Sequence, residues 1–233
     1  MHVAANSCEA MTGGEVSRSL GVERIRVVYA GDVERRMEAD EMIVRTPVLG
    51  GNPVRVCDLR SRGAEAGVGG QMLVADLAGI GPLGCAACHL GADAVVWDLG
   101  ELSPEYGAWA LVGVTRHALA CEAWADLAQA DKSDAPDLAE LEDVLATWER
   151  SRRAKNDAAL VLASYLRCHP AVGEVVYPGL KDDASYEVAS RQLLYGFGPM
   201  VDVRLTDGTW LRVEADDSPA QEQVMALERR LLR

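Results

Sequence analysis

The chain has 233 residues, of which 49% are hydrophobic and 25% are charged, as in ordinary globular proteins. This composition excludes fibrous and disordered classes. The net charge of -13 argues against binding nucleic acid or an anionic membrane through a general electrostatic field. The sequence contains no run of about eighteen apolar residues that could span a membrane, and residues 1–21 lack the apolar centre of a signal peptide. We therefore expect a cytoplasmic protein.

Short apolar runs alternate with helical segments between residues 22 and 115, which predicts a layered α/β unit with a mainly parallel sheet. The expected strands are Arg24–Tyr29, Met42–Arg45, Gln71–Ala75, Ala94–Trp97 and Ala110–Thr115. The expected helices are Val33–Ala39, Val56–Ala66 and Leu83–Leu90.

Two helices are expected in the middle of the chain, over Arg116–Gln129 and Pro136–Arg167. The second has leucines at helical spacing, which indicates a packing helix, and it ends at His169-Pro170. The tail predicts a smaller α/β unit. Its expected elements are strands Glu174–Tyr177, Met200–Leu205 and Thr209–Glu214, a helix over Asp183–Tyr195, a hairpin at Asp207-Gly208 and a final helix from Ser218-Pro219.

These elements divide the chain into four parts. Residues 1–21 form an N-terminal extension and residues 22–135 an α/β unit. Residues 136–168 form a long connecting helix, and residues 169–233 a small C-terminal α/β domain.

Two local patterns have an ordinary explanation beside a functional one. Cys85-Ala86-Ala87-Cys88-His89 matches the attachment pattern of c-type haem, but that chemistry needs export, and a short helix facing the sheet is the favoured interpretation. A second ligand pair for zinc is missing. The basic residues Arg150, Arg152, Arg153 and Lys155 are interpreted as a solvated helix face.

Two sets of motifs in the chain match a known family. In the tail they are His169-Pro170-x-Val172, Tyr177-Pro178-Gly179-Leu180 and Gly196-Phe197-Gly198-x-Met200-Val201. Upstream they are Thr46-Pro47 with Asn52-Pro53, Val74-Ala75-Asp76 and the stretch Gly91–Leu102. In these motifs the chain resembles the cystathionine γ-synthase/γ-lyase (trans-sulfuration) family of enzymes that depend on pyridoxal phosphate (PLP), and the upstream motifs are similar to the family's large domain. The resemblance implies a PLP-transferase fold of type I, with an incomplete large domain.

The resemblance also implies roles for three residues, each with a structural alternative. Asp76 corresponds to the aspartate that pairs with the pyridine nitrogen of PLP, or it caps the loop after a strand. Asn52 resembles a residue near the ring oxygen of the cofactor, or it is an ordinary turn asparagine. Arg212 resembles the arginine that grips the substrate carboxylate, or it is a strand arginine facing solvent.

The departures from the family pattern concern the cofactor most directly. Glu101 stands where the family keeps its Schiff-base lysine, and Lys132, Lys155 and Lys181 are the only lysines of the chain. The family's phosphate-cradling turn is absent, and Thr12-Gly13-Gly14 retains no aromatic residue that could stack on the ring. A degenerate member of the family, without a catalytic residue and without bound PLP, is therefore expected.

Three functions follow as alternatives. The first is a non-catalytic subunit that associates with a full-length PLP-dependent homologue, which would carry the cofactor and the chemistry. The second is an enzyme that works without PLP and uses Asp76 and Glu101 as acid and base, with Glu105 as a further candidate. The third is a binding module with no remaining catalytic site.

Overall fold

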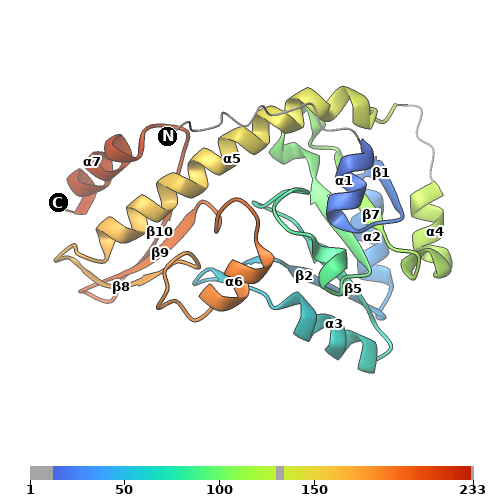
Figure 1. Cartoon of the computed structure of the whole chain (residues 1–233), viewed down its shortest axis with the longest axis horizontal. Coiled ribbons are helices and arrows are strands. Elements are labelled where there is room, and N and C mark those ends of the chain that lie inside the picture. The colour runs from blue at the N-terminus through green and yellow to red at the C-terminus, as the bar shows by residue number, and fades with distance from the viewer. Residues whose placement is uncertain (1–12, 130–133, 232–233) are drawn as a thin grey trace, which may run out of the picture.

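A computed structural model describes residues 13–129 and 134–231. Figure 1 shows two α/β parts at opposite ends of an elongated molecule, joined by the long helix α5 (Leu138–Leu166). The N-terminal part contains a five-stranded sheet and the C-terminal part a three-stranded sheet. The expected division of the chain into four parts stays a prediction.

The five-stranded sheet is mainly parallel, as predicted. It is built from β1 (Arg24–Tyr29), β2 (Ile43–Pro47), β5 (Met72–Asp76), β6 (Ala94–Asp98) and β7 (Trp109–Val114), in the order β1-β7-β6-β5-β2. The pairs β2–β5 and β5–β6 are parallel, whereas β7 is antiparallel to both β6 and β1. Four strands therefore run in one direction, and β7 alone runs against them.

Helices cover both faces of this sheet, which explains why its central strands are nearly continuous apolar runs. On one face, α1 (Gly13–Leu20), α3 (Leu59–Val68) and the N-terminal half of α5 enclose the largest core. On the other face, α2 (Ala30–Ala39) and α4 (Glu122–Gln129) pack against a second core around the buried side chain of Trp124.

Helix α5 links the two parts because each half of it packs in a different core. Asp137 caps its N-terminus in a capping box with Glu140. Leu141 and Leu145 belong to the core of the larger sheet, whereas Leu162 and Leu166 belong to the C-terminal core.

The prediction of a solvated basic face on α5 is wrong for Arg152. Arg152 and Glu149 are both buried, and the guanidinium donates two hydrogen bonds of 2.6 and 2.8 Å to the carboxylate. Arg153 also donates to Glu149 and stacks over the Tyr195 ring, 3.5 Å from its centroid. Lys155 pairs with Asp217 at 3.5 Å. These basic residues join α5 to its neighbours.

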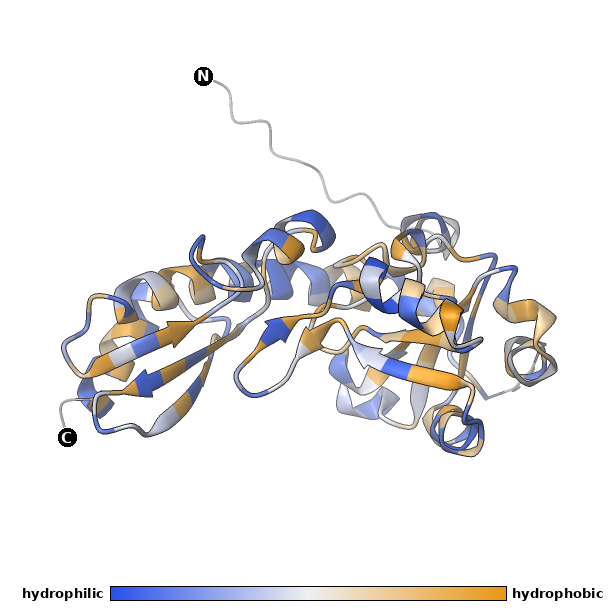
Figure 2. Cartoon of the chain, turned by 90° about the horizontal axis from the view of Figure 1, so that it is seen from below, coloured by the Kyte–Doolittle hydropathy of each residue, from blue (hydrophilic) through white to orange (hydrophobic). Residues whose placement is uncertain are grey.

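The C-terminal sheet is antiparallel in the order β10-β9-β8, with β8 (Val172–Val176), β9 (Met200–Leu205) and β10 (Trp210–Glu214). Gly208 has a φ of +90°, which confirms the predicted hairpin between β9 and β10. Hydrophobic and hydrophilic residues alternate along these strands in Figure 2, because one face packs on α5 and the other faces solvent. Helix α6 (Tyr186–Gln192) precedes β9, and α7 (Ala220–Leu231) ends the described chain.

Three local expectations need correction. The expected helix over Leu83–Leu90 is only the 3-10 turn η1 (Ala87–Leu90), and Gly84 packs so closely that an added Cβ would lie 2.1 Å from the Ile80 carbonyl oxygen. The expected helix from Arg116 is a 3-10 turn, η4 (Ala118–Ala120), followed by α4. Val56 belongs to a small hairpin of β3 (Leu49–Gly50) and β4 (Arg55–Val56), so α3 begins later than predicted. Within the described ranges, no helix is long and apolar enough to cross a membrane.

Candidate functional site

The carboxyl ends of two neighbouring parallel strands bring Asp76 and Glu101 to one edge of the larger sheet. Asp76 is the last residue of β5. Glu101 lies in η2 (Leu99–Glu101), directly after β6. In open α/β sheets this edge is where ligands commonly bind. The expected position of Asp76 at the end of a strand is confirmed.

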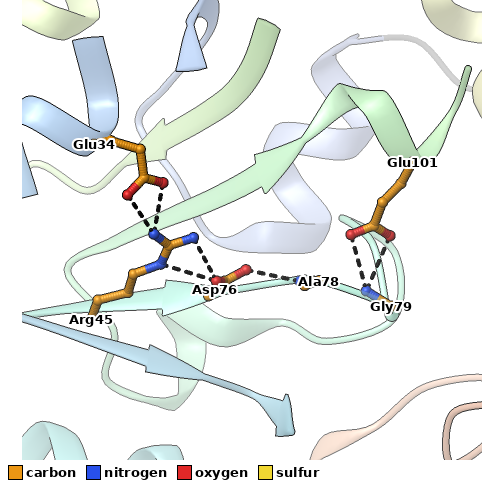
Figure 3. A network of polar contacts seen from close by, with 6 residues as sticks. All are labelled: Glu34, Arg45, Asp76, Ala78, Gly79 and Glu101. Carbon is orange, nitrogen blue, oxygen red and sulfur yellow. Dashed lines mark hydrogen bonds and ion pairs between the residues drawn. The ribbon is translucent and has the colours of Figure 1, made fainter. Parts of the chain in front are cut away.

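Both carboxylate oxygens of Asp76 already have partners (Figure 3). Oδ2 accepts a hydrogen bond of 3.0 Å from Nε of Arg45 and forms an ion pair with its Nη2 at 2.7 Å, and Oδ1 accepts a hydrogen bond of 3.0 Å from the Ala78 amide. The amide contact is the loop cap that the structural alternative predicted. The ion pair with Arg45 was not foreseen.

Arg45 lies between two carboxylates. It extends from β2 and donates from Nη1 to Glu34 of α2 at 2.7 and 3.0 Å, on the side opposite Asp76. Burial alone would lower the pKa of Arg45, but the charges of Asp76 and Glu34 more than offset this effect and raise it. Arg45 thus remains a fixed cation at the end of β5.

Glu101 closes the loop that follows Asp76. Its two carboxylate oxygens accept from the Gly79 amide at 3.2 and 3.1 Å, as Figure 3 shows. Burial raises the pKa of Glu101 to about 7, and the nearby negative charges of Asp76 and Asp98 add to this effect. The Gly79 amide and the indole of Trp97 oppose the shift, although the buried indole N–H makes no well-formed hydrogen bond.

Arg212 is engaged by a buried acid of its own sheet. Its Nε and Nη2 donate to the two carboxylate oxygens of Asp202 at 2.8 and 2.7 Å, and Nη2 also donates to the Gly51 carbonyl at 2.5 Å. The buried Asp202 accepts in addition from the Val54 amide. These contacts tie β9 and β10 to the turn at residues 51–54, while the Arg212 side chain stays 38% exposed on its strand.

The remaining predicted residues lie apart from these pairs. Asn52 is exposed in the turn that Arg212 holds, and Glu105 is exposed in a short 3-10 helix. Lys155 contacts Asp217 in the C-terminal part, and Lys132 lies outside the described residues, as does Thr12. The structure thus places the candidate residues in two separate groups. Asp76 and Glu101 form one group, and Arg212 with the turn that contains Asn52 forms the other.

The arrangement of these groups does not fit bound PLP. The cofactor needs an amine at its aldehyde, a free carboxylate at its ring nitrogen and a cation for the substrate carboxylate. Here Glu101 offers a carboxylate that holds Gly79, Asp76 is paired with Arg45, and Arg212 is paired with Asp202. We therefore assign no step to PLP in this chain.

Cavities occur elsewhere in the described chain. One of about 570 Å³ lies between α5, β10 and α7, and one of about 170 Å³ lies between α3 and α6. Across residues 13–129 and 134–231, no group of three His, Cys, Asp or Glu side chains is placed to hold a metal ion. Burial raises the pKa of both Cys85 and Cys88 to about 12, so these thiols of the haem-like pattern stay protonated and packed.

Comparisons with known proteins show which protein family the chain resembles. Residues 145–225, which include the second half of α5 and most of the C-terminal part, match the family model described as "Cys/Met metabolism PLP-dependent enzyme". This stretch of the chain is thus similar to the Cys/Met metabolism PLP-dependent enzymes. The resemblance inferred from the motifs is thereby confirmed.

Curated relatives of this family match over a short segment. The chain is 42% identical over 72 residues to a cystathionine gamma-synthase of Mycobacterium leprae, and 40% identical over 72 residues to that of Mycobacterium tuberculosis strain ATCC 25618 / H37Rv. In both cases the segment covers 31% of this chain and only 18% of the relative.

The fold matches over a longer stretch. The structure of apo CalE6 from Micromonospora echinospora, described as a methionine gamma lyase, superposes with a TM-score of 0.66 and 19% identity. The match covers 82% of this chain and 63% of that structure. The second CalE6 structure gives the same score at 18% identity. At this identity the likeness concerns the fold alone, and it confirms the predicted fold class.

Sequence reasoning missed the partners that occupy the predicted residues. Arg45, Glu34 and Asp202 each neutralise a charged side chain of the candidate site. A signal was available for Arg45, because an arginine within a short apolar strand needs a nearby carboxylate. For Asp202, three apolar neighbours in β9 similarly indicate a buried acid that requires a cation.

Proposed function

We propose that this chain is a non-catalytic subunit that associates in the cytoplasm with a full-length PLP-dependent homologue and supports its structure. The partner would be an enzyme of the C–S lyase or γ-synthase type and would carry the cofactor. The observation that carries the proposal is that Asp76, Glu101 and Arg212 are all satisfied by groups of the chain itself. Such pairs stabilise a scaffold and leave no free groups for chemistry.

The preserved C-terminal part supports an association within the family. Its core of α5, β8–β10 and α7 is well packed, and the motifs of the relatives lie in it. Proteins of one fold can combine when they keep the same interface surface, because the contacts of an isologous interface repeat on both subunits. A related enzyme is therefore the expected partner.

Co-expression with homologues from the same genome tests this proposal. A tagged chain is purified, and the mass of the complex is measured by light scattering after gel filtration. We expect a complex in which the visible absorption of lysine-bound PLP comes from the partner, and in which Glu101→Ala leaves the activity within about twofold. A monomer that binds none of the homologues would contradict the proposal.

One observation favours the second candidate, an enzyme that works without PLP. The pKa of Glu101, about 7, is suited to a general acid or base at neutral pH, and Asp76 lies near it. For this candidate, Glu101→Gln in partner-free chain should abolish an activity that Glu105→Gln retains. Activity that survives Glu101→Gln would exclude the role of Glu101.

A further inference from the structure

The ion pair between Arg45 and Asp76 weighs against binding of PLP independently of the missing lysine at position 101. We propose that Arg45 occupies the place at Asp76 that the ring nitrogen of PLP would need, so that the chain excludes PLP by a built-in ion pair. This inference deepens the proposed non-catalytic role and rests on it.

The Asp76 carboxylate is already engaged by groups of the chain itself. A charged carboxylate has about four acceptor positions. Arg45 donates one hydrogen bond from Nε to Oδ2 and places Nη2 2.7 Å from the same oxygen, and the Ala78 amide uses Oδ1, so the guanidinium occupies one side of the carboxylate. The Asp76 side chain is also only 16% exposed, which limits the directions from which a ligand could approach it.

Arg45 is held from both sides. Glu34 of α2 binds Nη1, while Asp76 binds Nε and Nη2. The backbone contributes as well, because β2 pairs with β5 in a fixed parallel register, with Pro47 opposite Asp76 and Arg45 opposite Val74. The guanidinium therefore reaches Asp76 from the neighbouring strand without the need for a long flexible loop.

Electrostatic repulsion also disfavours the cofactor at this place. A protonated pyridine ring at Asp76 would place a second cation beside the guanidinium, and like charges at such a short distance disfavour each other's charged form. The ring would then bind weakly or lose its proton. Restoration of an amine at position 101 alone should consequently not restore cofactor binding.

The experiment compares the full chain carrying Glu101→Lys with the double variant Arg45→Met/Glu101→Lys. Each is incubated with PLP and reduced with borohydride. The introduced amine condenses with the PLP aldehyde with loss of water, and borohydride supplies the hydride that converts the imine into a stable secondary amine. Peptide mass spectrometry then gives the labelled fraction at position 101, with Lys155 and Lys181 of the same chain as references for non-specific reaction.

We expect the single variant to be labelled at position 101 no more than at Lys155 or Lys181. In the double variant, labelling at position 101 should rise about tenfold at equal PLP concentration, which corresponds to about 1.4 kcal/mol. Arg62→Met/Glu101→Lys is the matched control, because Arg62 forms an exposed pair with Glu65 and its loss should change nothing.

Labelling at position 101 that does not rise when Arg45 is replaced overturns the inference, as does strong labelling in the presence of Arg45. If Arg45→Met unfolds the chain by circular dichroism, Arg45→Gln removes the charge and keeps a polar side chain of similar reach. Co-purification with a homologue does not depend on these results, so the proposed function can stand when this inference fails.

Discussion

At the scale of single residues, Glu101 makes the stability of the protein depend on pH. Its pKa in the folded chain is about 7, above the ordinary value of 4.5, so the folded state binds the proton more tightly than the unfolded state. The contribution of Glu101 is fully present below pH 4.5 and is lost as the pH rises through 7. Glu101→Gln removes this loss and keeps an acceptor for the Gly79 amide.

We therefore expect Glu101→Gln to raise the free energy of unfolding relative to the wild type by an amount that grows between about pH 4.5 and pH 7. The difference should reach at most about 3 kcal/mol. Urea titrations at four pH values measure it. Glu105→Gln, which removes an exposed carboxyl four residues later, is the control and should show no such growth. A pH-independent difference for Glu101→Gln would contradict the prediction.

The residue scale also shows what sequence reasoning could and could not reach. It located Asp76 and Glu101 at strand ends, because the parallel strand pattern fixes which ends lie together. It did not find Arg45 as the partner of Asp76, since the partner comes from a strand 31 residues earlier in the chain. Long-range side-chain contacts of this kind depend on register and packing that a local pattern does not contain.

At the scale of elements, Arg212 joins β10 to the turn at residues 51–54 through Asp202. Because Asp202 is buried, Arg212→Met would leave a carboxylate without its cation, and we expect a loss of about 3–5 kcal/mol in the free energy of unfolding. Urea denaturation followed by circular dichroism measures this loss. Arg204→Met on the adjacent strand removes only an exposed pair with Glu174 and should cost less than about 1 kcal/mol. Equal losses for the two variants would show that Arg212 has no special structural role.

Elements were predicted best where apolar periodicity was strong. Strands β1 and β9 were placed at their observed bounds, and α5 was placed within two residues at its start. Helix α1 was missed, although Val16 and Leu20 have the i, i+4 spacing of a buried helix face. The start of α3 was placed too early because its N-cap signal, Asp58, was not used: its carboxylate accepts from the amides of Arg60 and Ser61.

At the scale of the whole molecule, α5 is the main connection between two hydrophobic cores. Sequence periodicity predicted a long packing helix here, but it could not show that the two halves serve different cores, because the apolar stripe alone does not identify what packs against it. The structure places Leu141 and Leu145 in one core and Leu162 and Leu166 in the other. Folding of the two parts should therefore be coupled through the helix backbone.

A proline in the exposed middle of α5 tests this coupling. Ala154→Pro removes a backbone hydrogen bond and clashes with the preceding turn, at a cost of about 3 kcal/mol or more, without removal of a core side chain. We expect thermal unfolding of the wild type to coincide when followed by circular dichroism and by tryptophan fluorescence, and the two transitions to separate in the variant. Trp97, Trp109, Trp124 and Trp148 report mainly on the larger part, because Trp210 is the only tryptophan of the C-terminal sheet.

The control for this test is Ala154→Gly, which lowers helix stability by about 1 kcal/mol while the hydrogen bond remains. It should shift the transition to lower temperature and keep the two probes coincident. If the probes also coincide in Ala154→Pro, the coupling between the two parts must come from contacts outside the helix. The hydrogen bonds of Arg212 and Asp202 to Gly51 and Val54, and those of Gln192 in α6 to Leu59 and Cys57, would then be its source, since they join the C-terminal part directly to the larger part.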